Sequence, residues 1–254
     1  MVTKRIALVT GASSGIGRDI ARNLSRRGFR VILSARRENR LLELKEELVN
    51  AEIITADLTK QEECFRLYEE VKDKNICILV NCAGFGALGE FAETDLDNEL
   101  DMIDLNVKSV HILTKLFLKG FKEKDKGFIL NVSSSAGLMP SGPYMSAYYA
   151  TKAYITSLTT SIAHELKEQG SRVYVGALCP GPVDTEFNEV AGVNFGVKSI
   201  SSEYCADYAV KKMFERKTII VPSLSMKAGV VAQRFVPRSV MSKITSEIQK
   251  KKLD

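Results

Sequence analysis

Tryptophan is absent from the 254-residue sequence, and histidine occurs only twice, at His111 and His164. The five cysteines show no Cys-x-x-Cys spacing. Two distant histidines cannot build a histidine-rich metal site, so no metal is expected. An odd number of unpatterned cysteines makes a poor disulfide framework and fits a reducing compartment best.

Long hydrophobic runs are missing as well. The opening MVTKRIALVT contains too short an apolar run for a secretion signal. The longest uncharged stretch, residues 127–151, is rich in Ser, Gly and Pro, unlike a helix that faces lipid. We therefore expect a soluble protein located in the cytoplasm.

Excess positive charge is confined to the C-terminal end. Residues 201–254 contain eleven Lys or Arg and five Asp or Glu. Residues 225–254 interleave these cations with apolar side chains, a basic amphipathic tail in which Pro237 starts a second short helix. The tail could dock on the core, dock on a sister subunit, or make weak contact with an anionic membrane surface. Nucleic-acid binding is not expected, because the segment has few aromatics and no recognised motif.

Strand-like apolar runs alternate with helical periodicity along most of the chain. Strands are expected at 6–10, 30–34, 53–56, 76–80, 128–132, 172–178 and 218–221. Helices are expected from 16 up to Gly28 and at 38–49, 59–71, 97–121, 146–169 and 203–215. Thr59 and Glu62 predict a capping box at the third helix. The alternation predicts a single α/β domain over 1–254, doubly wound, with a parallel seven-stranded sheet and helices on both faces.

The first expected strand leads directly into the sequence Thr10-Gly-Ala-Ser-Ser-Gly-Ile-Gly17. A strand, a glycine turn and a helix N-terminus form an anion site, because exposed amides and the helix dipole both favour a pyrophosphate. Gly11 would permit the tight turn, Gly15 would admit the phosphates, and Gly17 would let the helix pack on the sheet. A tight strand-to-helix turn alone would also use glycines, but their position at the first βα junction predicts a nucleotide site.

This glycine pattern resembles the cofactor fingerprint of the short-chain dehydrogenase/reductase family. Further blocks resemble that family in the same order: Asp57-Leu58, NCAG at 81–84, Asn106, a serine run before Tyr148-x-x-x-Lys152, and CPGPVDT at 179–185. The resemblance covers residues 4 to about 222 and implies a Rossmann-like fold that binds a nicotinamide dinucleotide. It implies cofactor contacts from Gly11, Ser13, Ser14, Gly15, Ile16, Gly17, Asp57, Leu58, Asn81, Ala83, Gly84, Tyr148, Lys152, Pro180, Gly181, Val183 and Thr185.

The end of the second strand indicates which cofactor is used. NAD-dependent Rossmann sites place a carboxylate there, on the ribose 2′-hydroxyl, but this sequence has Ala35 followed by Arg36. A guanidinium suits a 2′-phosphate, so the resemblance implies NADP(H). Alternatively, Arg36 and Arg37 are surface charges that pair with Glu38.

Tyr148 and Lys152 are four residues apart on a predicted helix and therefore share a face. The resemblance implies that Tyr148 exchanges a proton with the substrate oxygen, while Lys152 lowers the pKa of the phenol and binds the nicotinamide ribose. Ser134, chosen from three consecutive serines because Ala136-Gly137 follows it, would hydrogen-bond the substrate oxygen. Asn106 would hold its helix locally open and position a water of a proton relay.

Residues 186–200 correspond to the family's substrate lid, after a cofactor and catalytic core at 1–185. Their apolar content implies a fairly apolar carbonyl or alcohol substrate, unless they pack on the protein or on another subunit instead. The residues expected at the substrate are Ser134, Leu138, Met139, Tyr144, Phe187 and Phe195.

The leading hypothesis is an NADPH-dependent oxidoreductase that interconverts a carbonyl and a secondary alcohol. The alternative is a catalytically silent NADP(H)-binding regulator, or a membrane-associated interaction protein, on the same fold. The family resemblance also implies a homodimer or homotetramer packed through helices 97–121 and 146–169.

Overall fold

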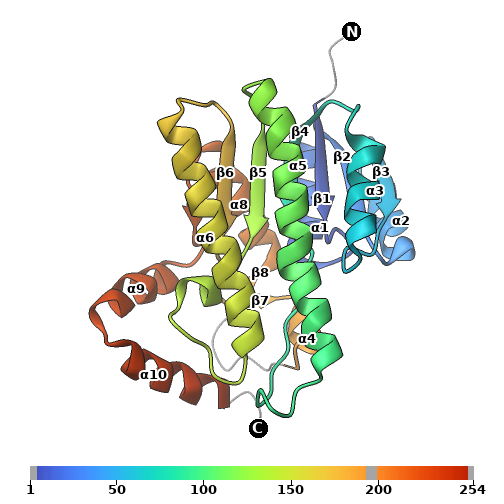
Figure 1. Ribbon diagram of the computed structural model, residues 1–254. Coiled ribbons are helices and arrows are strands. Elements are labelled where there is room, and N and C mark those ends of the chain that lie inside the picture. Colours follow the sequence, from blue (N-terminus) through green and yellow to red (C-terminus); the bar gives the residue numbers. More distant parts are fainter. Residues whose placement is uncertain (1–4, 193–198, 251–254) are drawn as a thin grey trace.

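The computed structural model describes residues 5–192 and 199–250. Its centre is a seven-stranded parallel sheet in the order β3-β2-β1-β4-β5-β6-β9 (Figure 1). The strands are β1 (Ile6–Thr10), β2 (Arg30–Ala35), β3 (Ala51–Thr55), β4 (Ile76–Asn81), β5 (Phe128–Val132), β6 (Tyr174–Leu178) and β9 (Ile219–Ile220). The predicted sheet is confirmed.

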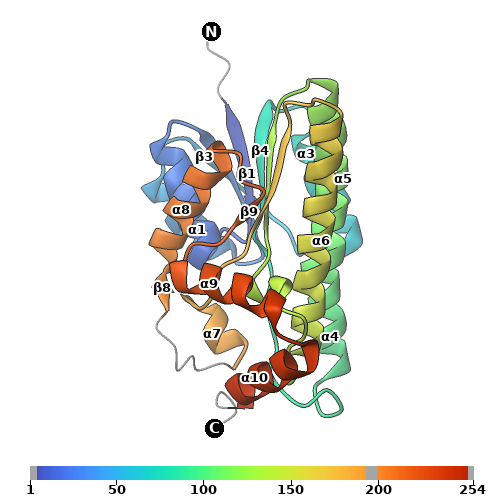
Figure 2. The ribbon, with the colours of Figure 1, turned by 90° about the vertical axis from the view of Figure 1, so that its left-hand side faces the viewer.

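Helices cover both faces of this sheet, as Figure 2 shows from the side. One face carries α1 (Gly15–Arg26), α2 (Glu38–Glu47) and α8 (Ser202–Phe214). The other carries α3 (Gln61–Val71), α5 (Val110–Glu123) and α6 (Ser146–Glu168). The strand order reverses at β1 and β4, and in such sheets ligands bind beyond the carboxyl ends of the strands.

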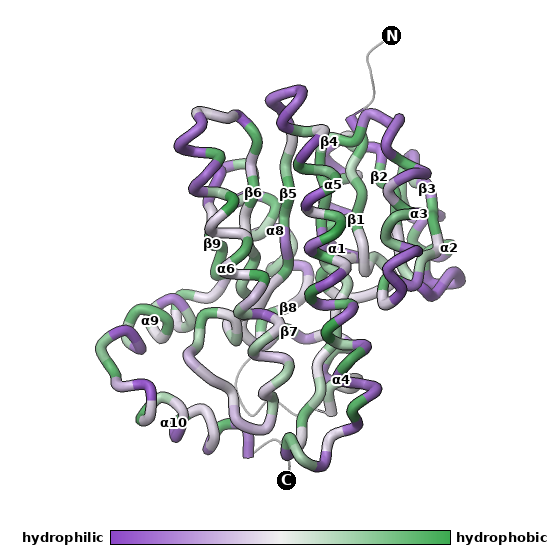
Figure 3. The backbone as a smooth tube through the Cα atoms, in the orientation of Figure 1, coloured by the Kyte–Doolittle hydropathy of each residue, from purple (hydrophilic) through white to green (hydrophobic). Residues whose placement is uncertain are grey.

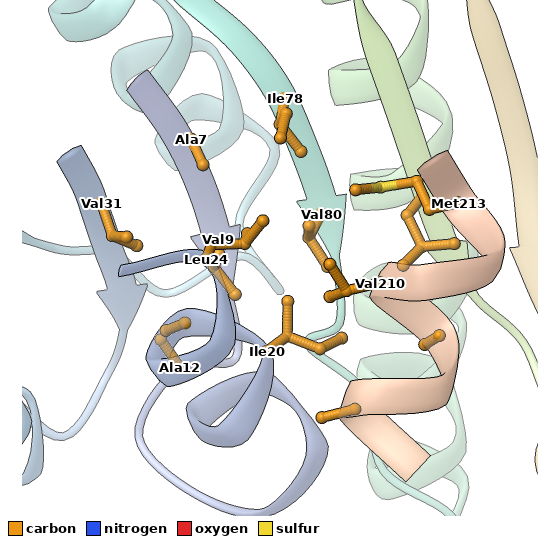
Figure 4. Packing of buried hydrophobic residues seen from close by; sticks show 14 of the residues in the cluster. Ala7, Val9, Ala12, Ile20, Leu24, Val31, Ile78, Val80, Val210 and Met213 are labelled. Atoms are coloured by element: carbon orange, nitrogen blue, oxygen red, sulfur yellow. The ribbon is translucent and has the colours of Figure 1, made fainter. Parts of the chain in front are cut away.

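Alternate residues of each strand enter opposite halves of the core. In β1, Val9 packs with α1 and α8, whereas Leu8 faces the side covered by α3 and α5. Figure 4 shows the first half, where Ile20 and Leu24 of α1 meet Val210 of α8 over the sheet. Figure 3 shows the hydrophobic residues that run along the strands. Burial of strands on both faces explains their nearly uninterrupted apolar sequences.

The single helix predicted over 97–121 is interrupted. The chain forms α4 (Leu96–Ile103), then a π-helical segment over Asp104–Ser109, then α5. Asn106 lies in the π-helical segment, and Ser109 Oγ donates to the Leu105 carbonyl at 2.6 Å. The π turn adds residues and shifts the helical register, so Val110 and Leu113 of α5 are buried whereas Leu100 and Ile103 of α4 are exposed.

The predicted capping box is wrong. Lys60 occupies the N-cap position of α3 with no side-chain cap, and the Thr59 hydroxyl donates instead to Asp57 at 2.9 Å. A second, two-stranded parallel sheet was also not predicted; it joins β7 (Val183–Asp184) to β8 (Ile200–Ser201).

The tail forms α9 (Leu224–Ala232) and α10 (Arg238–Lys250), with Pro237 just before the second helix as predicted. Figure 1 shows both helices at the end of the sheet where the strand arrows finish. Within 5–192 and 199–250, no helix combines the length and the apolar character that a membrane span requires.

Candidate active site

A cavity of about 530 Å³ opens at the carboxyl ends of the central strands. It collects residues from segments that are far apart in the sequence. The predicted residues that line it are Gly11, Ser13, Ser14, Gly15, Ile16, Gly17, Arg36, Leu58, Ala83, Gly84, Ser134, Met139, Tyr148, Lys152, Pro180, Gly181, Val183, Thr185 and Phe187. The fold thus brings most of the predicted cofactor and catalytic residues together.

The three glycines of the loop are packed so closely that a side chain would not fit at any of their positions. Gly11 has a φ of +66°, and a Cβ there would lie 2.7 Å from the Ala83 nitrogen. A Cβ on Gly15 would lie 2.9 Å from Thr185 Cγ2. One on Gly17 would lie 2.3 Å from the Gly11 carbonyl oxygen, so Gly17 allows α1 to start against the turn itself.

The substitution Gly17→Ala should destabilise the protein by about 1–3 kcal/mol, because the new methyl group would overlap a backbone oxygen that cannot move aside. Gly120→Ala is the matched control: it lies in α5, with nothing within 4 Å of an added Cβ. That control should raise stability by about 0.5–1 kcal/mol, because alanine favours helix. Urea unfolding of both variants checks this, and a Gly17→Ala protein as stable as wild type would contradict it.

Two neighbouring arginines behave differently beside this loop. Arg37 donates to Ser13 and Ser14 Oγ, the latter at 3.0 Å, and pairs with Glu186 at 2.8 Å. Arg36 lines the cavity without a hydrogen bond or ion pair to any residue in the described part of the chain. The alternative pairing of these arginines with Glu38 is not found, and the link from Arg37 to Glu186 was missed by the sequence analysis.

Ser134, Tyr148 and Lys152 all line the cavity. Burial raises the pKa of Tyr148 to about 12, and a hydrogen bond with Ser134 opposes that rise. Burial lowers the pKa of Lys152 to about 8. The net shift of the phenol pKa is therefore upward, opposite to the lowering expected from Lys152, because desolvation is its largest cause in this structure. At neutral pH Tyr148 is a protonated phenol, the form that can donate a proton.

Backbone groups hold Lys152 in place. Its Nζ donates to the Val132 carbonyl at 3.1 Å and lies 5.7 Å from the centre of the Tyr148 ring. The Ser133 hydroxyl, which the sequence analysis set aside, donates to the Lys152 carbonyl at 2.9 Å. Ser133 is thus a support for the helix that carries Tyr148 and Lys152.

Asn106 acts one layer behind the cavity and is not among the lining residues. Its Oδ1 accepts from the Phe85 nitrogen at 3.1 Å, and its Nδ2 donates to the Phe85 carbonyl at 2.8 Å. The same Nδ2 reaches Thr151 Oγ1 at 3.2 Å. The side chain thus ties the π-helical segment to the loop after β4 and to α6.

Two predicted cofactor contacts lie outside the cavity lining. The Asp57 carboxylate accepts from the Thr59 nitrogen and hydroxyl. The Asn81 amide is buried in the sheet, where Nδ2 donates to Asn131 at 2.9 Å and to Thr114 at 3.1 Å. These polar side chains therefore brace the strand ends, whereas their neighbours Leu58 and Ala83 face the cavity.

The predicted substrate residues divide in the same way. Met139 and Phe187 line the cavity, and the Phe187 ring lies 5.5 Å from that of Tyr148. Leu138 instead packs against Ala177, Cys179 and Val221, so its prediction needs correction. Tyr144 also lies away from the lining, with a φ of +65° and its ring 5.8 Å from Lys250 Nζ. Phe195 lies outside the described residues.

A family model for short chain dehydrogenases matches residues 5–193. The chain belongs to the short chain dehydrogenase family. An uncharacterized oxidoreductase of Staphylococcus epidermidis is 32% identical over 230 residues, covering 89% of this chain and 98% of that protein. A very-long-chain 3-oxoacyl-CoA reductase of Anas platyrhynchos is 33% identical over 199 residues, which cover 74% of this chain and 63% of the reductase.

Solved structures of the short chain dehydrogenases confirm the fold. A short-chain dehydrogenase from Sphingobium yanoikuyae, determined in complex with NADPH, superposes with a TM-score of 0.82 at 30% identity, covering 94% of this chain and 95% of the other. A family member from Burkholderia phymatum, determined with NAD, also gives 0.82, at 22% identity over 92% and 95% of the two chains.

The C-terminal helices of this short chain dehydrogenase contribute residues to the cavity wall that were not predicted from the sequence. Met226 of α9 and Thr245, Ile248 and Gln249 of α10 all line the cavity. Asn188 of the short helix α7 (Phe187–Val190) lines the cavity as well. Its buried Oδ1 has no partner among the described residues. No motif marks these positions; only the packing of the tail brings them to the site.

Proposed function

We propose that this protein is an NADPH-dependent reductase that interconverts a carbonyl and a secondary alcohol on a fairly apolar substrate. The observation that carries the proposal is one cavity shared by Ser134, Tyr148, Lys152, the glycine loop and Arg36, which has no partner among the described residues. The NADPH complex of the Sphingobium yanoikuyae relative supports this cofactor. The NAD complex at lower identity supports only a nicotinamide dinucleotide in general.

The residues of the cavity fit that cofactor. The tight turn at Gly11 and the start of α1 expose backbone amides that would hold a pyrophosphate. Arg36 would bind the 2′-phosphate through paired, charged hydrogen bonds. Ala83 and Gly84 would lie along the adenosine side, and Pro180 and Gly181 along the nicotinamide side.

The chemistry follows from the protonation states of the site. When bound, the nicotinamide supplies or accepts a hydride at the substrate carbon. Tyr148 donates its phenol proton to the substrate oxygen during reduction, and in the reverse direction the phenolate form would take the proton of the alcohol. Ser134 hydrogen-bonds the same oxygen and stabilises the charge that develops there. Lys152, held by the Val132 carbonyl, provides the cation that stabilises the phenolate left behind.

Consumption of NADPH with a panel of ketones, aldehydes and acyl thioesters tests this function. Turnover of one class is the expected result, and apolar members of that class should be preferred, because Met139, Met145 and Phe187 line the cavity beside Tyr148. Tight cofactor binding without turnover of any compound would favour a silent regulator instead.

We propose that the protein also forms a homo-oligomer through α4–α5 and α6, the assembly implied by its family. Leu100 and Ile103 of α4 and Tyr154 of α6 are exposed hydrophobic residues on these helices. The molecular mass in solution, measured by light scattering, distinguishes a monomer from a dimer or tetramer.

A second candidate function is suggested by the outer face of the tail. Phe235 is 85% exposed, Val240 46% and Ile244 45%, although each is a large apolar side chain. Residues 224–250 also contain five Lys or Arg and one Glu. Like charges would oppose pairing of two such faces, whereas an anionic lipid surface complements both the charge and the apolar stripe. We propose that the tail attaches the protein to anionic membranes.

Flotation with phosphatidylserine-containing vesicles measures this attachment. The triple substitution of Phe235, Val240 and Ile244 by serine should weaken it at least about tenfold, because each of these exposed side chains contributes about 1 kcal/mol on burial. A variant with serine at Leu42, an exposed leucine of α2, should bind like wild type. Absence of wild-type flotation, or equal flotation of the triple variant, would remove the membrane proposal.

A further inference from the structure

Helix α10 packs on the rest of the protein through its polar side, the reverse of an ordinary amphipathic helix. Thr245 is 6% exposed and Gln249 3%, while the apolar Val240 and Ile244 face outward. Ser242 Oγ also meets Ser141 Oγ at 2.6 Å. Polar side chains are rarely buried without a hydrogen-bonding purpose, so the inward face of α10 requires an explanation.

Gln249 is only partly satisfied where it lies. Its Nε2 donates to Tyr149 Oη at 2.8 Å. Its Oε1 is buried and has no hydrogen-bond partner within the described part of the chain. Both Gln249 and Tyr149 line the cavity. An unpaired amide oxygen costs stability, unless a ligand supplies the missing donor.

Tyr149 completes a donor and acceptor pair with this amide. Its Oη accepts from Gln249, and among residues 5–192 and 199–250 no acceptor takes its proton. Burial raises the pKa of Tyr149, so the phenol keeps that proton at neutral pH. Rotating the amide by half a turn exchanges its oxygen and nitrogen, and the pair still offers one donor and one acceptor.

The pair lies in the same cavity as the reacting group, but separated from it. Tyr149 follows Tyr148 on α6, and their ring centres are 6.4 Å apart. The neighbouring lining is apolar, with Met145 and Phe187 packed in the same cluster. A substrate whose carbonyl reaches Tyr148 would therefore cross an apolar stretch before it meets Gln249.

We infer that Gln249 and Tyr149 form a polar subsite for a hydroxyl group of the substrate, remote from its reacting carbonyl. The hydroxyl donates to the Gln249 amide oxygen and accepts from Tyr149 Oη. The substrate class is then an apolar hydroxyketone or the corresponding diol. This inference rests on the proposed function, because it assumes that the carbonyl sits at Tyr148.

Direct binding tests the subsite without relying on turnover. The probes are decalones that carry a hydroxyl at varied ring positions, each compared with the unsubstituted decalone, in the presence of NADP⁺ and by calorimetry. Wild type should bind at least one hydroxydecalone about tenfold or more tightly than decalone, since a polar site discriminates against a ligand that leaves it unpaired. Gln249→Leu should abolish this preference and change decalone affinity less than threefold.

Gln233→Leu is the matched control. Gln233 lies on the same tail and also has a buried Oε1 without a partner among the described residues, but it does not line the cavity. It should keep the wild-type preference, even if the tail is destabilised. Equal binding of all probes by wild type, no binding of any, or a preference that survives in Gln249→Leu would overturn the subsite. A preference for a hydroxydecalone without NADPH-dependent turnover of any ketone would instead contradict the proposed function alone.

Discussion

Replacing Tyr148 by phenylalanine should lower turnover by about 10²–10⁴-fold, the usual contribution of a positioned acid–base group. The phenol is buried, it is protonated at neutral pH, and Ser134 hydrogen-bonds it. Phenylalanine keeps the ring that packs against Phe187 and removes only the proton donor. NADPH affinity, measured by titration, should therefore change by less than a few-fold, and the loss should appear in kcat.

Tyr154→Phe is the control for this experiment. Tyr154 lies on the same helix, is 41% exposed and contacts His111 through its hydroxyl, away from the cavity. Its substitution should leave kcat unchanged. If Tyr148→Phe turned over at the wild-type rate, the assignment of the proton donor would be wrong, and the silent-regulator hypothesis would gain support.

Substituting Arg36 by alanine should weaken NADPH binding about 10- to 100-fold, because a lost charged hydrogen-bonding partner costs about 1.5–3 kcal/mol. NADH has no 2′-phosphate, so its affinity should change by less than a few-fold. The prediction depends on Arg36 lining the cavity without a partner in the described part of the chain. Arg37 is already engaged by Glu186.

Arg40→Ala controls for the general loss of positive charge. Arg40 lies on α2, four residues further along, and pairs with Glu43 outside the cavity. Titrations at two salt concentrations separate screening from direct contact. Equal weakening of NADPH and NADH by Arg36→Ala would show that Arg36 does not read the 2′-phosphate.

The sheet and the glycine loop were predictable because their causes are local. Strands such as β4 are buried on both faces, and this leaves a continuous apolar run that periodicity detects. The turn at Gly11 requires a positive φ and close contact with Ala83, so the glycine itself marks the place. The family-like motifs follow one another in the expected order along the chain, and this order predicted that Tyr148 and Lys152 lie at the same edge of the sheet as the glycine loop.

The tail was not predictable in the same way. Its amphipathic pattern showed which residues share a face but not which face is buried, and the polar face with Gln249 turned out to be the inner one. Leu138 and Tyr144 were chosen because they lie near Ser134 in the sequence, yet Leu138 packs beneath α9 and Tyr144 turns away at a positive φ. Tertiary packing, rather than local pattern, decided each of these positions.

The pKa of Tyr148 could not be predicted from the sequence either. Spacing on a helix brings Lys152 near the phenol, and an ammonium alone would lower its pKa. The sequence could not reveal that both groups would be buried, so that desolvation raises the one pKa and lowers the other. The two shifts leave a proton donor beside a cation at neutral pH, which suits reduction.

Paired titration of the purified wild-type protein with NADPH and NADH tests the central claim most directly. The account predicts saturable binding of NADPH, with NADH at least about tenfold weaker because it cannot engage Arg36. Binding of neither cofactor would contradict the assignment of the glycine loop as a dinucleotide site and the reductase chemistry that depends on it.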